Sequence, residues 1–125
     1  STPHLIGERI DTDTDQLRWA RGYDHTYLLD KELGKLAIAS RCSSPKTGIV
    51  MEVYTDQPGV QLYTGNWMSG NLRGKHDHRY PARAALCLET QHYPDSPNKP
   101  EYPSTRLNPG ETFRSTTIFR FTLKA

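Results

Sequence analysis

Short strand-like stretches separated by proline and glycine most constrain the fold of this 125-residue chain. Residues 35–42 and 48–54 alternate apolar with other side chains, and a third stretch, 59–64, follows a Gln-Pro-Gly turn. Two more stretches lie at 84–91 and 112–123, and no segment has the repeat of a helix longer than a turn or two. The pattern predicts an all-β chain whose antiparallel strands form a β-sandwich.

One of these stretches contains an isolated carboxylate, Glu89, in a run that otherwise resembles a buried strand. Alternation places Glu89 on the same face as Ala85, Cys87 and Gln91, so the carboxylate would rise from small residues that leave room for a ligand. Prolines follow and would end the strand, as at the rim of a cleft. The alternative is a glutamate at a sheet edge that points into water.

The charge of the chain is nearly balanced. Sixteen Lys and Arg residues oppose 14 Asp and Glu residues, which gives a formal net charge of +2, and the two signs are interspersed. A nucleic-acid surface would concentrate the basic residues, so we expect no nucleic-acid partner. No run approaches the ~18 apolar residues that span a membrane. Hydrophobic residues make up only 34% of the chain, and a partner chain could supply the remainder of a core.

The cysteines and two neighbouring histidines lack the spacing of a metal or redox motif. Cys42 and Cys87 are most simply interpreted as buried free thiols in a reducing compartment, and a disulfide is the alternative. His76 and His78 would share one face of a strand, but no third ligand is indicated and the surrounding glycines favour a loop. We therefore expect no metal and no cofactor.

Three segments together resemble one family, the galactose mutarotases or aldose 1-epimerases. They are Gly-Tyr-Asp-His at 22–25, Asp-Gln-Pro-Gly-Val-Gln-Leu-Tyr-Thr-Gly-Asn at 56–66 and Cys-Leu-Glu-Thr-Gln at 87–91. Their order and spacing agree with the family, and flanking runs extend the resemblance over nearly the whole chain. The resemblance implies the antiparallel β-sandwich of the galactose mutarotase type.

The resemblance also implies a reaction, the interconversion of the α and β anomers of an aldohexose such as galactose or glucose. Ring opening takes a proton from the anomeric hydroxyl while the ring oxygen receives one, so an acid and a base act together. Glu89 matches the base of the family. Asp24 matches an aspartate that accepts sugar hydroxyls, and Gln61 matches a glutamine that contacts the monosaccharide substrate. From the residues alone, Asp24 would be a turn residue and Gln61 an ordinary polar residue of an outer face.

The acid of the family is a histidine in its earlier part, and none of the five histidines of this chain lies in the matching motif. Mutarotases are also longer than this chain. We therefore expect residues 1–125 to be the C-terminal portion of a single mutarotase-like β-sandwich domain, inactive and poorly folded alone. The missing N-terminal segment would join it as a second chain or a swapped copy. The expected compartment is the cytoplasm, with secretion or the periplasm left open because that segment is missing.

A second interpretation is a non-catalytic carbohydrate-binding β-sandwich that kept the scaffold without turnover. Glu89 together with Asp24 and Gln61 favours the enzyme, because a pure binding module needs no base poised for proton transfer. The absence of the acid favours the binding module for this chain taken alone.

Overall fold

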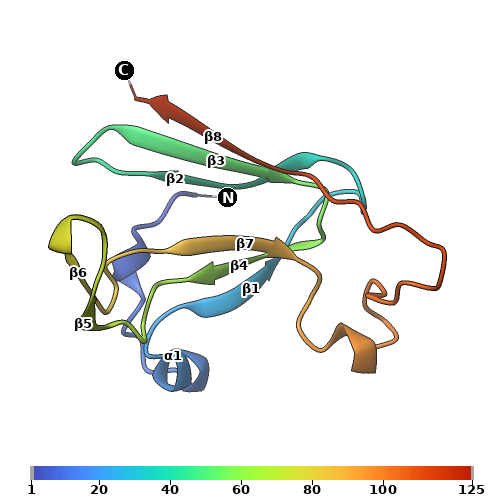
Figure 1. Cartoon of the computed structure of the whole chain (residues 1–125), viewed down its shortest axis with the longest axis horizontal. Coiled ribbons are helices and arrows are strands. Elements are labelled where there is room, and N and C mark those ends of the chain that lie inside the picture. The colour runs from blue at the N-terminus through green and yellow to red at the C-terminus, as the bar shows by residue number, and fades with distance from the viewer. Residues whose placement is uncertain (1, 125) are drawn as a thin grey trace. The chain divides into compact units, whose positions relative to one another are not determined.

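The computed structural model describes residues 2–124 and consists mainly of short strands (Figure 1). The strands are β1 (Asp24–Leu28), β2 (Ala37–Ser43), β3 (Ile49–Thr55), β4 (Gly59–Tyr63), β5 (Ser69–Arg73), β6 (Arg79–Pro81), β7 (Cys87–Gln91) and β8 (Thr117–Leu123). The helical elements of residues 2–124 are α1 (Asp15–Ala20) and three 3-10 turns, η1 (Ile6–Glu8), η2 (Lys75–Asp77) and η3 (Ser96–Asn98). The expected all-β class is confirmed.

All five strands expected from the sequence are present. Three begin within two residues of the expected start, and two begin three or more residues later. β7 starts at Cys87 rather than at residue 84, because Arg83 has a positive φ of 64° and the Ala84 N–H donates to the Pro81 carbonyl in a turn. β8 starts at residue 117 rather than 112, since the N–H of Thr116 donates to the Asp56 carboxylate over 2.8 Å. In both cases a polar contact holds the flanking backbone outside the regular strand.

The antiparallel sheet β2-β3-β8 is built around its central strand, β3. Val53 lies in the middle of β3 opposite Phe119 of β8, and its side chain is fully buried. Thr55, also fully buried, ends the strand opposite Thr117. A register shift between Ile38 and Ser40 interrupts the pairing of β2 with β3.

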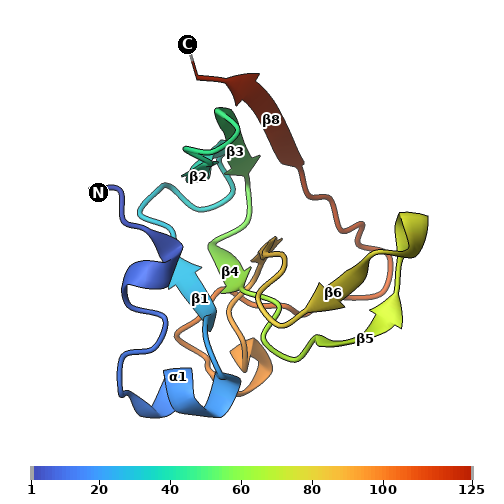
Figure 2. The ribbon, with the colours of Figure 1, turned by 90° about the vertical axis from the view of Figure 1, so that its left-hand side faces the viewer.

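The remaining strands form a sheet of order β1-β4-β7 and an antiparallel pair, β5 and β6, which lie side by side in Figure 2. Contacts divide the chain into two compact units, which we call unit 1 (residues 2–25 and 61–88) and unit 2 (residues 26–60 and 89–124). The buried hydrophobic residues of residues 2–124 are Ile10 and Leu17 of unit 1 and Val50, Val53 and Val60 of unit 2. Each unit therefore contributes few large side chains to a core.

Large apolar side chains remain exposed along β8. Phe119, Phe121 and Leu123 alternate along the strand and so share one face of the sheet, and they are 49%, 64% and 75% exposed. Ile49, opposite Leu123 on β3, is 45% exposed. An apolar sheet face of this kind is normally covered by further protein.

The cysteines are free, as expected, but they are less buried than predicted. Cys42 on β2 is half-buried, and burial raises the pKa of its thiol. Cys87 on β7 is exposed, so the prediction of a buried thiol is wrong there. Within residues 2–124 no group of three or more His, Cys, Asp or Glu side chains could hold a metal ion. No helix in that range is long and apolar enough to cross a membrane.

Candidate functional site

Asp24 and Gln61, singled out from the sequence, are in direct contact. Asp24 is the first residue of β1, Gln61 is the middle residue of β4, and the two strands are neighbours in their sheet. The Gln61 Nε2 donates a hydrogen bond of 2.6 Å to Asp24 Oδ1. Asp24 is exposed and Gln61 is half-buried, so the carboxylate stands open to solvent while the amide orients it.

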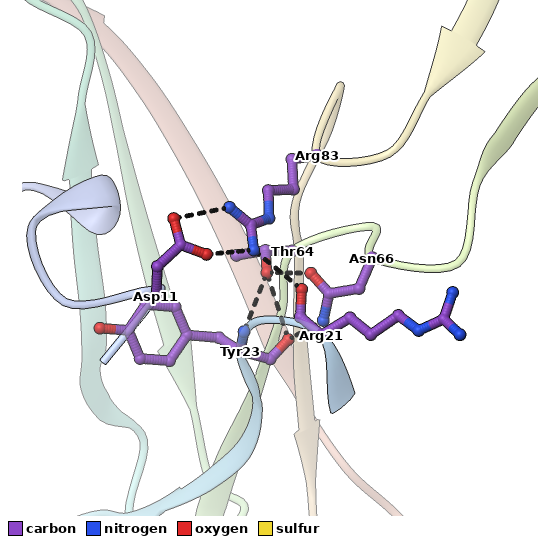
Figure 3. A network of polar contacts seen from close by, with 6 residues as sticks. All are labelled: Asp11, Arg21, Tyr23, Thr64, Asn66 and Arg83. Carbon is purple, nitrogen blue, oxygen red and sulfur yellow. Dashed lines mark hydrogen bonds and ion pairs between the residues drawn. The ribbon is translucent and has the colours of Figure 1, made fainter. Parts of the chain in front are cut away.

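A closed ring of hydrogen bonds holds the backbone directly before Asp24 (Figure 3). The Tyr23 N–H donates to Thr64 Oγ1 over 3.1 Å, and the Thr64 hydroxyl donates to Asn66 Oδ1 over 2.6 Å. The Asn66 Nδ2 then donates to the Tyr23 carbonyl over 2.9 Å, which closes the ring. We call this ring the Tyr23 clamp. Thr64 and Asn66 are 3% and 5% exposed, so their polar atoms are paired away from water.

Glycine at position 22 makes the clamp possible. Gly22 has a φ of +146°, which side chains with a Cβ rarely adopt. A Cβ at this position would overlap Asn66 Oδ1 and lie 2.8 Å from Asn66 Cγ. Asn66 can therefore reach the Tyr23 carbonyl only because residue 22 lacks a side chain.

An ion pair holds the turn that leads into the clamp (Figure 3). Arg83 Nη2 donates both to Asp11 Oδ1 over 2.7 Å and to the Arg21 carbonyl over 3.0 Å, and Arg83 Nη1 donates to Asp11 Oδ2 over 3.2 Å. The hydrogen bond from the guanidinium lowers the pKa of the Asp11 carboxyl below its ordinary value. The same contact raises the pKa of Arg83. Arg21, with a φ of 59°, ends α1, so Arg83 fixes the helix end that precedes Gly22.

A surface cavity of about 660 Å³ lies beside this ion pair. Its lining includes Asp11, Thr64, Arg83 and Ala85, all of unit 1. Neither Asp24 nor Gln61 lines it. The cavity is therefore distinct from the site that the sequence predicts.

The third predicted site residue, Glu89, lies in the middle of β7. Cys87 and Glu89 are exposed, whereas Leu88 and Thr90 are half-buried, so the predicted alternation of faces is correct over residues 87–90. Gln91, predicted on the face of Glu89, is half-buried. The expectation of a buried strand is wrong: β7 ends the strand order β1-β4-β7 and one of its faces is open. Glu89 belongs to unit 2, so the contact between Asp24 and Gln61 in unit 1 does not by itself extend to it.

Sequence reasoning missed the roles of Thr64 and Asn66. Both lie in the segment 56–66 that carries the family resemblance, directly after the strand that holds Gln61. The available signal was Gly22, since a glycine next to a candidate binding residue indicates a close approach of another chain segment. Asn66, the residue that approaches Gly22, lies more than 40 positions away in the sequence, and no local pattern reveals such a contact.

Comparisons with known proteins identify the class to which this chain and its fold belong. A family model described as aldose 1-epimerase matches residues 1–120. Among solved structures, the crystal structure of a GalM/aldose epimerase homologue from C. elegans superposes with a TM-score of 0.71 at 25% identity. It matches 82% of this chain and 30% of that one. The chain belongs to the aldose 1-epimerase family and has its fold, as the sequence predicted.

Individual relatives are named either galactose mutarotase or aldose 1-epimerase. Galactose mutarotase from Mus musculus is 46% identical over 102 residues, and the protein of that name from Homo sapiens is 44% identical over the same length. Each match covers 82% of this chain and 30% of the relative. Aldose 1-epimerase from Escherichia coli is 36% identical over 120 residues, which is 94% of this chain and 34% of the relative. The chain thus spans about a third of the length of these relatives.

The role of Gly22 can be tested in a chimera in which this chain replaces the matching segment of the mouse galactose mutarotase. Gly22→Ala should open the Tyr23 clamp, because the added Cβ takes the place of Asn66 Oδ1. Forcing a side chain into such a backbone conformation costs roughly 1–3 kcal/mol, so amide exchange at Tyr23 and Thr64 should accelerate about tenfold or more. NMR-detected hydrogen exchange measures this directly.

Gly7→Ala is the matched control. It makes the same substitution in unit 1, and nothing lies within 4 Å of the added Cβ. Equal exchange rates at Tyr23 and Thr64 in the two variants would show that Gly22 does not support the clamp.

Proposed function

We propose that this chain supplies part of the active site of an aldose 1-epimerase, which interconverts the α and β anomers of an aldohexose such as galactose or glucose. The observation that carries the proposal is the hydrogen-bonded pair of Asp24 and Gln61 in a chain of the aldose 1-epimerase family. The substrate is a free monosaccharide, whose adjacent hydroxyls are groups that a carboxylate and an amide bind well.

The chemistry of the pair suits binding rather than proton transfer. An exposed carboxylate such as Asp24 accepts two hydroxyl hydrogens at once, and these charge-assisted hydrogen bonds are stronger than neutral ones. Gln61 donates to Asp24 Oδ1 and so holds the carboxylate in one orientation before the sugar arrives. An acceptor held in place loses less conformational freedom on binding.

Glu89 takes the role of base in this proposal. Its carboxylate removes the proton of the anomeric hydroxyl, the C1–O5 bond breaks, and an acid protonates the ring oxygen to give the open aldehyde. Rotation about the C1–C2 bond turns the other carbonyl face toward the C5 hydroxyl, and reversal of both proton transfers closes the ring as the other anomer. The exposed position of Glu89 on β7 leaves its carboxylate accessible to a sugar. The acid is a histidine outside this chain.

The preceding segment of the same enzyme is the partner that supplies the acid. Two observations support this part of the proposal: the chain spans about a third of its relatives, and the face of β8 with Phe119, Phe121 and Leu123 is exposed. Residues 1–125 then form the C-terminal portion of one β-sandwich domain. The preceding segment covers the apolar face, either as a second chain or through exchange between copies.

A non-catalytic carbohydrate-binding module is the second candidate. None of the five histidines of this chain lies in the motif of the family's acid, which favours binding without turnover for this chain taken alone. Mutarotation separates the candidates, since a binding module would retain a sugar without accelerating its anomerisation.

Glu89→Gln in the chimera should lower the turnover number by ~10² or more, the scale of a general-base contribution. The amide keeps the size and hydrogen bonding of the side chain but cannot accept the proton. Polarimetry of freshly dissolved α-galactose measures the rate. Glu101→Gln, at an exposed residue of unit 2, is the control and should be unchanged. Mutarotation at the normal rate in Glu89→Gln would exclude Glu89 as the base.

Asp24→Ala and Gln61→Ala should weaken sugar binding while the chemical step persists. Each removes hydrogen bonds worth ~1–3 kcal/mol when a charged or buried group takes part, so KM should rise about 5- to 100-fold with a smaller change in kcat. Asp30→Ala and Gln16→Ala remove the same groups from exposed positions and serve as controls. Loss of kcat at unchanged KM would contradict a binding role.

The 125-residue chain alone should show no mutarotase activity and should associate in solution. The missing acid abolishes turnover, and the apolar face of β8 favours contact between copies. Light scattering and amide exchange on the purified chain measure its association and its protection. Adding the remaining segment of the mouse relative should restore the activity and should also restore slow exchange of the backbone amides. A monomeric, protected and active chain would contradict the proposed partner.

A further inference from the structure

We propose that Asn66 is a positioning residue for sugar binding, because the Tyr23 clamp fixes the Asp24 carboxylate against Gln61. The inference rests on the proposed role of Asp24 and Gln61 in binding the sugar. Asn66 acts on that pair through the backbone of Tyr23, the residue next to Asp24.

The clamp joins the two strands that carry the binding pair. Tyr23 directly precedes β1, which begins at Asp24, and Thr64 directly follows β4, which contains Gln61. Besides the side-chain ring, the Thr64 N–H donates to the Tyr23 carbonyl over 3.1 Å. The start of β1 is therefore tied to the end of β4, and this tie sets the position of Asp24 relative to Gln61.

The direction of each hydrogen bond in the ring determines how the Asn66 amide is oriented. Thr64 Oγ1 accepts from the Tyr23 N–H, and its single hydrogen has a nearer acceptor in Asn66 Oδ1, at 2.6 Å, than in the Tyr23 carbonyl, at 3.3 Å. The Nδ2 of Asn66 must then face the Tyr23 carbonyl, as observed. The amide of Asn66 offers both an acceptor to Thr64 and a donor to Tyr23 from one planar group.

Burial explains why loss of the Asn66 Nδ2 donor should displace the backbone at Tyr23. The Tyr23 carbonyl accepts from the Asn66 Nδ2, and the Asn66 side chain lies in a nearly water-free position, 5% exposed. If an oxygen replaced Nδ2, two acceptors would face each other with little water to separate them. The peptide between Tyr23 and Asp24 would turn away, and the Asp24 carboxylate would leave Gln61.

The variant Asn66→Asp makes this exchange with almost no change of shape. In the chimera it should raise the KM for galactose about tenfold while kcat stays within about twofold, because binding rather than proton transfer is disturbed. The NMR signals of the Gln61 side-chain amide should shift, because its acceptor Asp24 has moved. Asn71→Asp, which adds the same charge at an exposed residue of β5, should leave both readouts unchanged.

Thr64 offers an independent test with a conservative rescue. Thr64→Val removes the hydroxyl at constant shape and should also raise KM and shift the Gln61 amide, whereas Thr64→Ser keeps the hydroxyl and should preserve both within about twofold. Thermal unfolding of each variant separates positioning from stability. A purely structural role would lower the melting temperature of Asn66→Asp and Thr64→Val with KM and the Gln61 signals unchanged, and that result would overturn the inference.

The proposed function and the positioning role of Asn66 can be refuted separately. A folded wild-type chimera that neither binds galactose nor accelerates mutarotation would refute the proposed function, while a shift of the Gln61 amide in Asn66→Asp would still support the clamp. A normal Gln61 amide in Asn66→Asp and Thr64→Val would refute the positioning role whatever the activity.

Discussion

The proposed site depends on one partly buried ring of hydrogen bonds, in which the backbone of Tyr23 both donates to Thr64 and accepts from Asn66. The ring ties the start of β1 to the end of β4, and these two strands carry Asp24 and Gln61. Hydrogen bonds buried from water permit few alternative arrangements, because each unpaired group would be costly. In our proposal, the exposed Asp24 carboxylate owes its position to this ring.

Two features of the chain support our proposal that it is one part of a larger fold. The chain matches about a third of each curated relative, and its sheet β2-β3-β8 exposes phenylalanine side chains that a complete domain would cover. Our proposal that the acid and the covering strands come from the preceding segment explains both features together. It also explains how one chain carries the proposed sugar-binding residues and a candidate base without the acid that a proton-transfer cycle needs.

Much of the fold and part of the candidate site could be predicted from the sequence, and the predictions that failed did so for physical reasons. Alternation located the strands and the faces of β7, because side-chain direction follows from backbone geometry alone. It could not show that the face with Cys87 and Glu89 lies open, since burial depends on distant segments. The family motif identified Asp24 and Gln61, but the ring formed by Thr64 and Asn66 depends on an approach to Gly22 across the sheet.

The most direct test of the account is a crystal structure of the chimera with bound galactose. The account predicts Asp24 Oδ2 and the Gln61 amide within about 3.2 Å of sugar hydroxyls, with the Glu89 carboxylate at the anomeric hydroxyl. A sugar bound elsewhere, with Glu89 far from C1 and Asp24 facing only water, would contradict it.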